Sequence, residues 1–432
     1  MKLRPAPIIA ALLLAAIGLL ATVVVAEYVT VLLFFSAALL GGVAPVEVVF
    51  SGFHSGAFWL VFGGLVIGIG VHESGLAPRL ARVVARRLSG SYPLAVAGVV
   101  AIAVLFSLFV PSTMGRLLVL MPIVLALAEG LGFKPGSNGY IGLALALPYA
   151  TMLPGFAILP ATVPGIILAG AGETLYGITI NYASYLWLHF PVLGLLKAIV
   201  IWGAVVLMFP DRVTDRAETP PLPGMSRDER LMALLLVLAL ALWMTDYLHG
   251  IAPAWVALAI ATVTVLPVAG LVSLAAFNER MNLGTLLYIA GTLGIGAMIA
   301  HSDLDDFLAA LALDYLPFRP GEAVGALLLI AALGTLLGVL ATQPAIPLIM
   351  SPLAADMARV TDLPVETVLM AQVVGFSTVV LPYQTPPLVV GMALAGISAR
   401  DGIKFCLATF AVTVLVLIPL DILWWKLIGW LP

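Results

Sequence analysis

The sequence predicts an all-α polytopic membrane protein, and three observations lead to this fold class. Hydrophobic residues make up 62% of the 432 residues and charged residues only 9%, whereas soluble domains carry about 25% charged residues. Apolar runs long enough to cross a bilayer as helices recur along the whole chain. Short motifs of the first half return in the same order in the second half. A hidden water-soluble domain is excluded, because the longest polar stretch, residues 211–230, has only the length of a loop.

Each half of the chain is expected to contain five membrane spans and one re-entrant hairpin. A hairpin is predicted where two helices too short to span comfortably are joined by a small polar turn with proline, and a kinked pair of spans is the alternative. The hairpins are expected at about 94–131 and about 324–357. The spans are expected at 8–26, 29–42, 57–71, 143–170 and 186–209, and at 231–247, 252–268, 283–300, 368–396 and 405–427.

Two of these spans are expected to break in the middle. Segment 381–388 contains three prolines and segment 159–165 contains two. Each proline removes a backbone donor and blocks a carbonyl one turn back, so a regular helix cannot continue there. A helix broken at membrane depth is tolerated only where its freed backbone groups face protein or a wet cavity. In transporters such breaks bind ions and substrates, so the two broken helices, 143–170 and 368–396, predict a transport site.

Matching motifs indicate an internal duplication. Gly63–Gly68 is similar to Gly291–Gly296, and Thr162–Pro164 is similar to Thr385–Pro387. Across four such matches the offset lies between 223 and 230 positions. Because an odd number of spans turns the following half upside down, the chain would form an inverted repeat. Its parts would be a first repeat at 1–210, a cytoplasmic linker at 211–230 and a second repeat at 231–432.

The distribution of charge supports this inversion. Segment 72–88 carries four arginines, whereas its counterpart, 302–318, carries four aspartates and no lysine or arginine. By the positive-inside rule the first segment lies in the cytoplasm and the second outside. Five charges oppose this scheme: Lys2, Arg4, Arg319, Arg359 and Lys426.

Six segments match motifs of one known family: Phe50–Phe53, Phe58–Gly63, Glu73–Leu76, Tyr149–Pro164, Thr245–Ile251 and Leu381–Pro387. Together they resemble the divalent anion:sodium symporter family of the ion transporter superfamily, whose members carry dicarboxylates, citrate and sulfate. The resemblance covers nearly the whole length and is most specific at Leu381–Pro387, which is close to the family's Thr-Pro-Pro-Asn break. It implies a homodimer in which hairpins and broken helices form a transport domain that slides past a scaffold, an elevator-type movement.

The hairpin tips and the two breaks are expected to form one central site. Helix N-termini at the tips have free backbone donors that attract anions, and unwound carbonyls suit hard cations, which take oxygen ligands. The family's tips carry Ser-Asn-Thr, and this chain departs from that pattern at both tips. The candidate substrate-binding residues are Ser112, Thr113, Arg116, Thr342, Gln343, Pro344, Thr385 and Pro386. The candidate cation-binding residues are Ser107, Pro111, Ser112, Thr151, Gly155, Thr162, Ala341, Gln384 and Thr385, and sodium is the metal ion considered there.

Charged residues inside apolar runs need a partner. Arg116 stands three residues after Thr113, and an intramembrane arginine is usually paired or functional. It would pair with an anionic substrate or, alternatively, bond to hairpin carbonyls. Lys197 is a second such charge, whose long side chain could snorkel to the interface, and Asp421 is expected to be solvated at a helix end.

The sequence therefore predicts a secondary active transporter that moves small anions, di- or tricarboxylates or sulfate, across a bacterial-type cytoplasmic membrane. A cation gradient would drive it, with sodium preferred over protons. The alternatives are an ion antiporter or oxyanion exporter of the same superfamily, a channel, or a membrane enzyme, for which no catalytic pair or nucleophile motif is present. Sodium is the only cofactor considered, and no transition metal or nucleic acid is expected. The expected partners are the small anion, the lipid bilayer and a second copy of the chain.

Overall fold

The computed structural model describes residues 6–22, 25–88, 90–110, 112–213, 224–302 and 318–432, and every regular element in this part of the chain is a helix. The first half contains α1 (Ala6–Thr22), α2 (Glu27–Leu40), α3 (Val46–Val49), α4 (Ser51–His54), α5 (Gly56–Glu73), α6 (Leu76–Leu88), α7 (Tyr92–Ser107) and α8 (Thr113–Gly130). It continues with α9 (Asn138–Met152), the 3₁₀ segments η1 (Pro154–Ala157) and η2 (Leu159–Ala161), α10 (Val163–Tyr176), α11 (Tyr182–His189), the π-helical η3 (Phe190–Leu196) and α12 (Lys197–Met208).

The second half follows with a similar list. It contains α13 (Arg227–Met244), α14 (Asp246–His249), α15 (Pro253–Val265), α16 (Leu274–Arg280), α17 (Leu283–His301), α19 (Ala323–Leu340), α20 (Ala345–Met350) and α21 (Ala354–Thr361). It ends with α22 (Val365–Phe376), the 3₁₀ segment η4 (Pro382–Gln384), α23 (Pro386–Leu394), α24 (Ala399–Val412), the π-helical η5 (Thr413–Leu417) and α25 (Ile418–Leu427).

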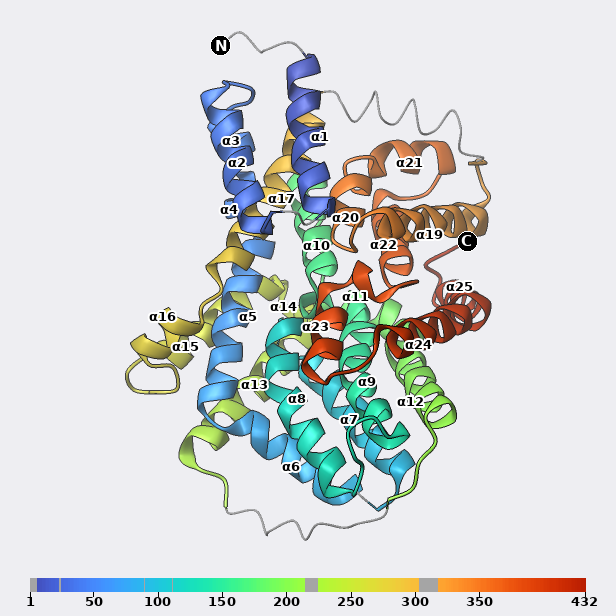
Figure 1. Cartoon of the computed structure of the whole chain (residues 1–432). Coiled ribbons are helices and arrows are strands. Elements are labelled where there is room, and N and C mark those ends of the chain that lie inside the picture. The colour runs from blue at the N-terminus through green and yellow to red at the C-terminus, as the bar shows by residue number, and fades with distance from the viewer. Residues whose placement is uncertain (1–5, 23–24, 89, 111, 214–223, 303–317) are drawn as a thin grey trace.

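The same succession of elements thus occurs twice. A long helix, α5 or α17, precedes a helix pair, α7–α8 or α19–α21. A helix interrupted by 3₁₀ turns follows, and the last helix of each half is interrupted by a π-helical segment. Figure 1 shows α7 and α8 in the lower part of the molecule and α19 and α21 in the upper part. The order of elements fits a duplication, while the inversion of one half across a membrane stays a prediction.

Both expected helix breaks are confirmed. α9 ends at Met152 and α10 begins at Val163, while α22 ends at Phe376 and α23 begins at Pro386. The prolines lie in the 3₁₀ turns or in the first turn of the following helix, where a missing N–H leaves no intrahelical bond unmade. The first broken helix extends further than expected at both outer ends, from Asn138 to Tyr176, whereas the second runs from Val365 to Leu394, close to its expected bounds.

The second helix pair differs from the expected hairpin. Its returning arm is two short helices, α20 and α21, separated at Ser351, Pro352 and Leu353. The hydroxyl of Tyr176 on α10 donates to the carbonyls of Ser351 and Pro352 at 2.7 and 2.9 Å, so a partner from the first half satisfies groups that the interruption frees. The expectation of one continuous arm was therefore wrong.

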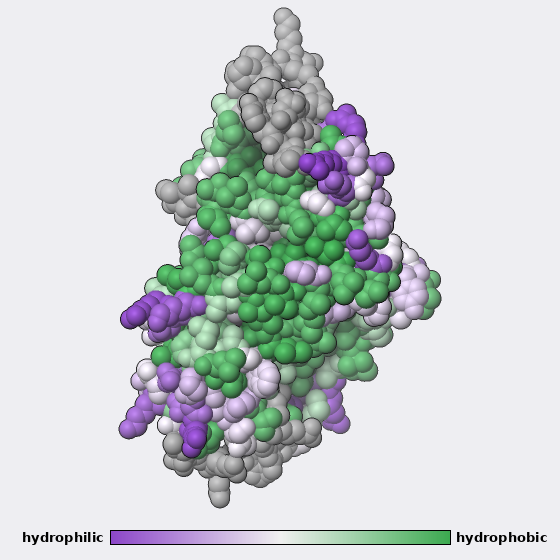
Figure 2. Space-filling model, turned by 90° about the vertical axis from the view of Figure 1, so that its right-hand side faces the viewer, coloured by the Kyte–Doolittle hydropathy of each residue, from purple (hydrophilic) through white to green (hydrophobic). Residues whose placement is uncertain are grey.

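The exterior and the core agree with a membrane environment. Seven helices in the described part of the chain are long and apolar enough to cross a bilayer. Figure 2 shows a broad hydrophobic band across one face with hydrophilic groups above and below it. α9 is buried along nearly its whole length and packs against α7, α8, α12 and α23, so the first broken helix forms the centre of the fold.

Candidate functional site

Arg116 connects the first helix pair to the first broken helix. It lies in the first turn of α8 and is 1% exposed. Its Nη1 donates to the carbonyl of Val110, just before the tip, and its Nη2 donates to the carbonyls of Thr151 and Ala161 at 3.2 and 3.0 Å. The hydroxyl of Thr113 accepts a further bond from Nη2 at 3.1 Å. Four protein oxygens therefore surround the guanidinium, as in the alternative that placed Arg116 on backbone carbonyls.

The other first-half candidates gather around this guanidinium. Thr113 also donates to the Ala161 carbonyl at 3.1 Å, and Ser107 donates to the Thr151 carbonyl at 3.4 Å. Ser112 caps α8 by accepting from the Gly115 amide at 3.1 Å. A Cβ added at Gly155 would lie 3.6 Å from Nη2 of Arg116 and 3.3 Å from Cγ2 of Thr162. The structure thus brings together Ser107, Ser112, Thr113, Arg116, Thr151, Gly155 and Thr162, whereas Pro111 lies outside the described residues.

The second tip makes a parallel contact with the second break. The backbone amide of Gln343 donates to the backbone carbonyl of Gln384 at 3.0 Å. The side-chain oxygen of Gln384 accepts from the backbone amides of Val380 and Leu381, both at 2.7 Å. The side chains of Gln343 and Gln384 are fully buried. Thr385 is the N-cap residue and Pro386 the first residue of α23, and Pro344 is the N-cap residue of α20. Ala341 and Thr342, both buried, form the connection from α19 to this tip.

The two tip-to-break contacts occupy matching places in the chain. Thr113 and Gln343 are 230 positions apart, and their acceptors, Ala161 and Gln384, are 223 positions apart. These are the offsets found among the repeated sequence motifs. The ring of Phe156 in η1 lies 5.6 Å from that of Phe376 at the end of α22, so the two breaks are neighbours.

Lys197 is a second buried cation at a break. Its Nζ donates to the Ser377 carbonyl, at the C-terminal end of α22, at 2.8 Å. Lys197 is 1% exposed, so the expectation that it snorkels to an interface was wrong. Asp421 on α25 is 0% exposed and acts electrostatically on Lys197, so the expectation that it is solvated was also wrong.

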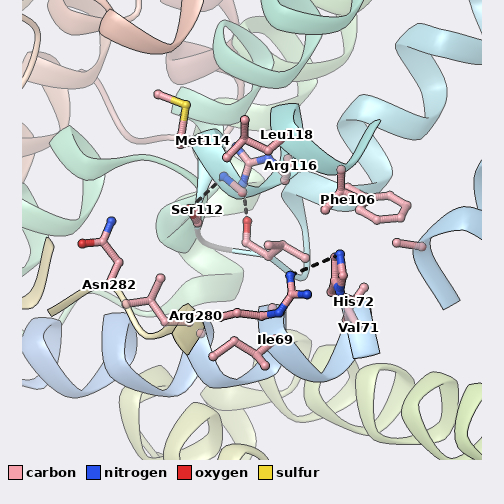
Figure 3. A pocket seen from close by; sticks show the side chains of 17 residues that line it. Ile69, Val71, His72, Phe106, Ser112, Met114, Arg116, Leu118, Arg280 and Asn282 are labelled. Atoms are coloured by element: carbon pink, nitrogen blue, oxygen red, sulfur yellow. Dashed lines mark hydrogen bonds between the residues drawn. The ribbon is translucent and has the colours of Figure 1, made fainter. Parts of the chain in front are cut away.

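A cavity of about 490 Å³ opens beside the first tip. Its walls come from α5, from the α7–α8 pair and from the segment around α16 and the start of α17. Figure 3 shows Arg116 and Ser112 on one side of it and His72, Arg280 and Asn282 on the other. Of the candidate substrate-binding residues, only Ser112 and Arg116 line this cavity; Thr113, Thr342, Gln343, Pro344, Thr385 and Pro386 do not.

Arg280, His72 and Asn282 are cavity residues that the sequence interpretation missed. Arg280 Nη1 lies 3.3 Å from Nε2 of His72, and its Nε lies 3.2 Å from a carboxylate oxygen of Glu73. No aspartate or glutamate is among the residues that line the cavity. The available signal was the polar stretch Asn278–Asn282 directly before an apolar span.

Comparisons with known proteins identify what the chain resembles. The family described as the sodium:sulfate symporter transmembrane region matches residues 2–431. A protein called "Membrane protein" from Cupriavidus necator is 24% identical over 405 residues, covering 88% of this chain and 76% of that protein. The sodium-dependent dicarboxylate transporter SdcS of Staphylococcus aureus (strain USA300) is 25% identical over 228 residues, covering 48% of this chain and 42% of SdcS. The crystal structure of the Alcanivorax borkumensis YdaH transporter aligns with a TM-score of 0.60 at 20% identity, over 98% of each chain, and so shares the fold.

Proposed function

This chain belongs to the family of the sodium:sulfate symporter transmembrane region, and we propose that it is a secondary active carrier of small anions. It is a multi-pass integral membrane protein, and its family and relatives are transporters rather than enzymes. The proposal adds the substrate class, the cytoplasmic membrane of a bacterium as the location, and a cation gradient as the driving force.

The observation that carries the proposal is the charge of the cavity. Arg280 and Arg116 line it and carboxylates do not; Glu73, which contacts Arg280 from outside the lining, offsets one of these two charges, so a net positive charge remains and favours a negative ligand. The hydroxyl of Ser112 and the amide of Asn282 offer neutral hydrogen-bond donors on opposite sides. A volume of about 490 Å³ lies within the usual range for small-molecule sites, which is roughly 300–1,000 Å³.

Dicarboxylates and sulfate are the substrates to test first. Both carry two negative charges, which suits a cavity with two separated cations, Arg280 and Arg116. The name of the staphylococcal relative points to dicarboxylates and the family description to sulfate. Sodium is the first coupling ion to test, because the same two descriptions include it, and protons are the alternative.

The second tip lies away from the cavity, and we propose that a movement of the protein brings it into use. Gln343 and Thr385 are buried away from the cavity. We infer that the helix pairs and broken helices move together as a transport domain against α5 and α15, in an elevator-type step that exposes the second tip on the other side. We also propose that the protein is a homodimer, in which the partner subunit holds the scaffold in place.

Uptake into proteoliposomes tests the function. Purified protein should accumulate labelled succinate or sulfate with saturation, and an inward flux should increase when unlabelled anion is loaded inside. Arg280→Gln should raise the half-saturation concentration about tenfold or more, because a hydrogen bond to a charged group contributes about 1.5–3 kcal/mol. Arg400→Gln, at an exposed position on α24, is the matched control. Flux that rises linearly with concentration, without counterflow, would indicate a channel and contradict the proposal.

Cysteine reporters test the inverted repeat that the movement requires. In a Cys406→Ala background, a cysteine at Arg82 should be labelled from the cytoplasm and a cysteine at Glu322 from outside. Both positions are exposed, and Cys406, the one cysteine of the sequence, is buried. Labelling of both reporters from the same side would exclude the inversion.

A further inference from the structure

In each broken helix, the part before the break ends at a backbone carbonyl that accepts a hydrogen bond from a buried cationic side chain. Thr151 lies in the last turn of α9, and its carbonyl accepts from Arg116. Ser377 is the C-cap residue of α22, and its carbonyl accepts from Lys197. Thr151 and Ser377 are 226 positions apart, within the 223–230 range of the repeated motifs. The two cations therefore occupy matching places, although they come from different elements, α8 and α12.

The carbonyls at these places are the natural ligands of a cation. The last carbonyls of a helix have no intrahelical partner and carry the negative end of the helix dipole. Sodium requires several such oxygens in one shell, as hard cations do. Around Arg116 the shell already exists: three carbonyls, from Val110, Thr151 and Ala161, and the hydroxyl of Thr113 all bind the guanidinium.

A sodium ion and these side chains exclude each other. An ion bound to the Thr151 carbonyl would lie within about 4 Å of the guanidinium, and repulsion between two unit charges at that distance weakens binding about a thousandfold in a partly buried setting. The same holds for the Ser377 carbonyl and Lys197 Nζ, which are 2.8 Å apart. Arg116 forms no ion pair within the described part of the chain, so its charge stays available to balance an anion, whereas the nearby carboxylate of Asp421 offsets part of the charge of Lys197. The first-break residues that the sequence assigned to sodium around Thr151 therefore do not fit sodium.

We propose that Arg116 and Lys197 are tethered counter-cations: they take the positions that coupling sodium ions would occupy at the two breaks, so the carrier moves its anion without binding sodium there. The inference rests on the proposed function, and it replaces sodium as the coupling ion at this site. The anion's charge is balanced by the protein, and the drive comes from another gradient, such as protons or a counter-flowing anion.

A purely structural role for Arg116 makes a different prediction. If the arginine only ties α8 to the first break, its removal loosens the protein and nothing more. If it stands in for a cation, its removal opens a shell of four oxygens that a small cation can enter. Arg116→Ala should then acquire a response to sodium that the wild type lacks.

Thermal unfolding in detergent measures this response. Wild type, Arg116→Ala, Arg116→Lys and the exposed control Arg400→Ala are heated in NaCl or choline chloride at about 150 mM, which is roughly physiological ionic strength. We expect wild type, Arg116→Lys and the control to differ by less than about 1 °C between the salts. Arg116→Ala should gain several degrees in sodium, since a ligand that binds only the folded state stabilises it. A few millimolar guanidinium should replace sodium in this variant.

The outcomes decide between the two roles. An Arg116→Ala protein that is destabilised equally in both salts and does not respond to guanidinium would assign Arg116 a structural role and overturn the inference. If Arg116→Ala does not fold, the melting temperature of the wild type in the two salts provides the test. An increase of that temperature in sodium but not in choline would also overturn the inference. Lys197→Met combined with Asp421→Asn, which removes both buried charges, repeats the test at the second break, with exposed Lys426→Met as control.

Transport separates this inference from the proposed function. Wild-type uptake of succinate or sulfate should change less than twofold when sodium is replaced by choline on both sides of the proteoliposome membrane. Uptake that requires sodium would refute the tethered counter-cations while supporting an anion carrier. Absence of uptake for every anion in either salt, from protein that melts cooperatively, would refute the proposed function instead.

Discussion

The contact between α5 and α15 provides a test of the packing that holds the cavity wall. Gly63 lies on α5, next to the cavity residue Gly64, and it faces the backbone of Ala257 on α15. A Cβ added at Gly63 would lie 2.6 Å from the carbonyl carbon, 2.8 Å from the carbonyl oxygen and 2.9 Å from Cβ of Ala257. Ordinary contacts between carbon atoms are about 3.5–4.0 Å, so α15 would have to move by about 1 Å.

The expected cost follows from this overlap. Overpacking of a well-packed interior costs about 1–3 kcal/mol, and alanine gains up to about 1 kcal/mol over glycine in helix propensity. Gly63→Ala should therefore lower the free energy of unfolding by about 0–2 kcal/mol, which is about 1–3 kcal/mol less stable than the same change at an open site. Gly203 on α12 is the matched control, because a Cβ there would meet nothing within 4 Å. Gly203→Ala should be neutral or more stable than wild type by up to about 1 kcal/mol.

Equilibrium unfolding in mixed micelles, followed by tryptophan fluorescence, measures both variants. The two substitutions are chemically identical, so their difference reports the surroundings of each glycine. If Gly63→Ala and Gly203→Ala differ by less than about 0.5 kcal/mol, the close approach of α5 and α15 is wrong.

Two further predictions concern carboxylates outside the cavity. Arg79 donates to Glu229, which lies 2.8 Å away and before the apolar run of α13. This bond holds the pKa of the Glu229 carboxyl below its usual value. The stabilisation is therefore present above the unfolded pKa of about 4.3 and is lost as the pH falls through the folded pKa. Melting temperatures should drop more steeply at acid pH in wild type than in Glu229→Gln, and parallel curves would contradict the assignment. Glu173 on α10 accepts from the Gly56 amide at the N-terminus of α5 at 2.7 Å; Glu173→Ala should lower the free energy of unfolding by about 1.5–3 kcal/mol, whereas a change below about 0.5 kcal/mol would show that the bond is replaced by water.

Local signals made the breaks predictable, but they did not predict every interruption. Prolines in 159–165 and 381–388 act within one turn, so their effect can be read without tertiary structure. Pro122 and Pro352, matched by the repeat, behave differently: Pro122 stays inside α8, while Pro352 separates α20 from α21. At Pro352 the hydroxyl of Tyr176, on a distant helix, donates to the carbonyls of Ser351 and Pro352. No sequence pattern around Pro352 contains that information.

The site was predictable as a set of segments but not as a set of bonds. The tip and break around Arg116 were placed together correctly, because the prolines and small polar residues mark them locally. The partner of Lys197, the Ser377 carbonyl, is 180 positions away, and carbonyls carry no sequence signature. Arg280 was missed as a cavity residue because its position depends on how α16 packs beside α5.

The proximity of Lys197 and Asp421 has a consequence for how the two halves of the chain depend on each other. The two residues are 224 positions apart, each beyond a π-helical segment, and they bury opposite charges within electrostatic reach of each other. Two identical half-length chains that assembled in this way would bury lysine against lysine or aspartate against aspartate. Complementary charges at these positions therefore require two halves that differ in sequence. Each half depends on the other for its buried charge, so neither can be exchanged for a second copy of its counterpart.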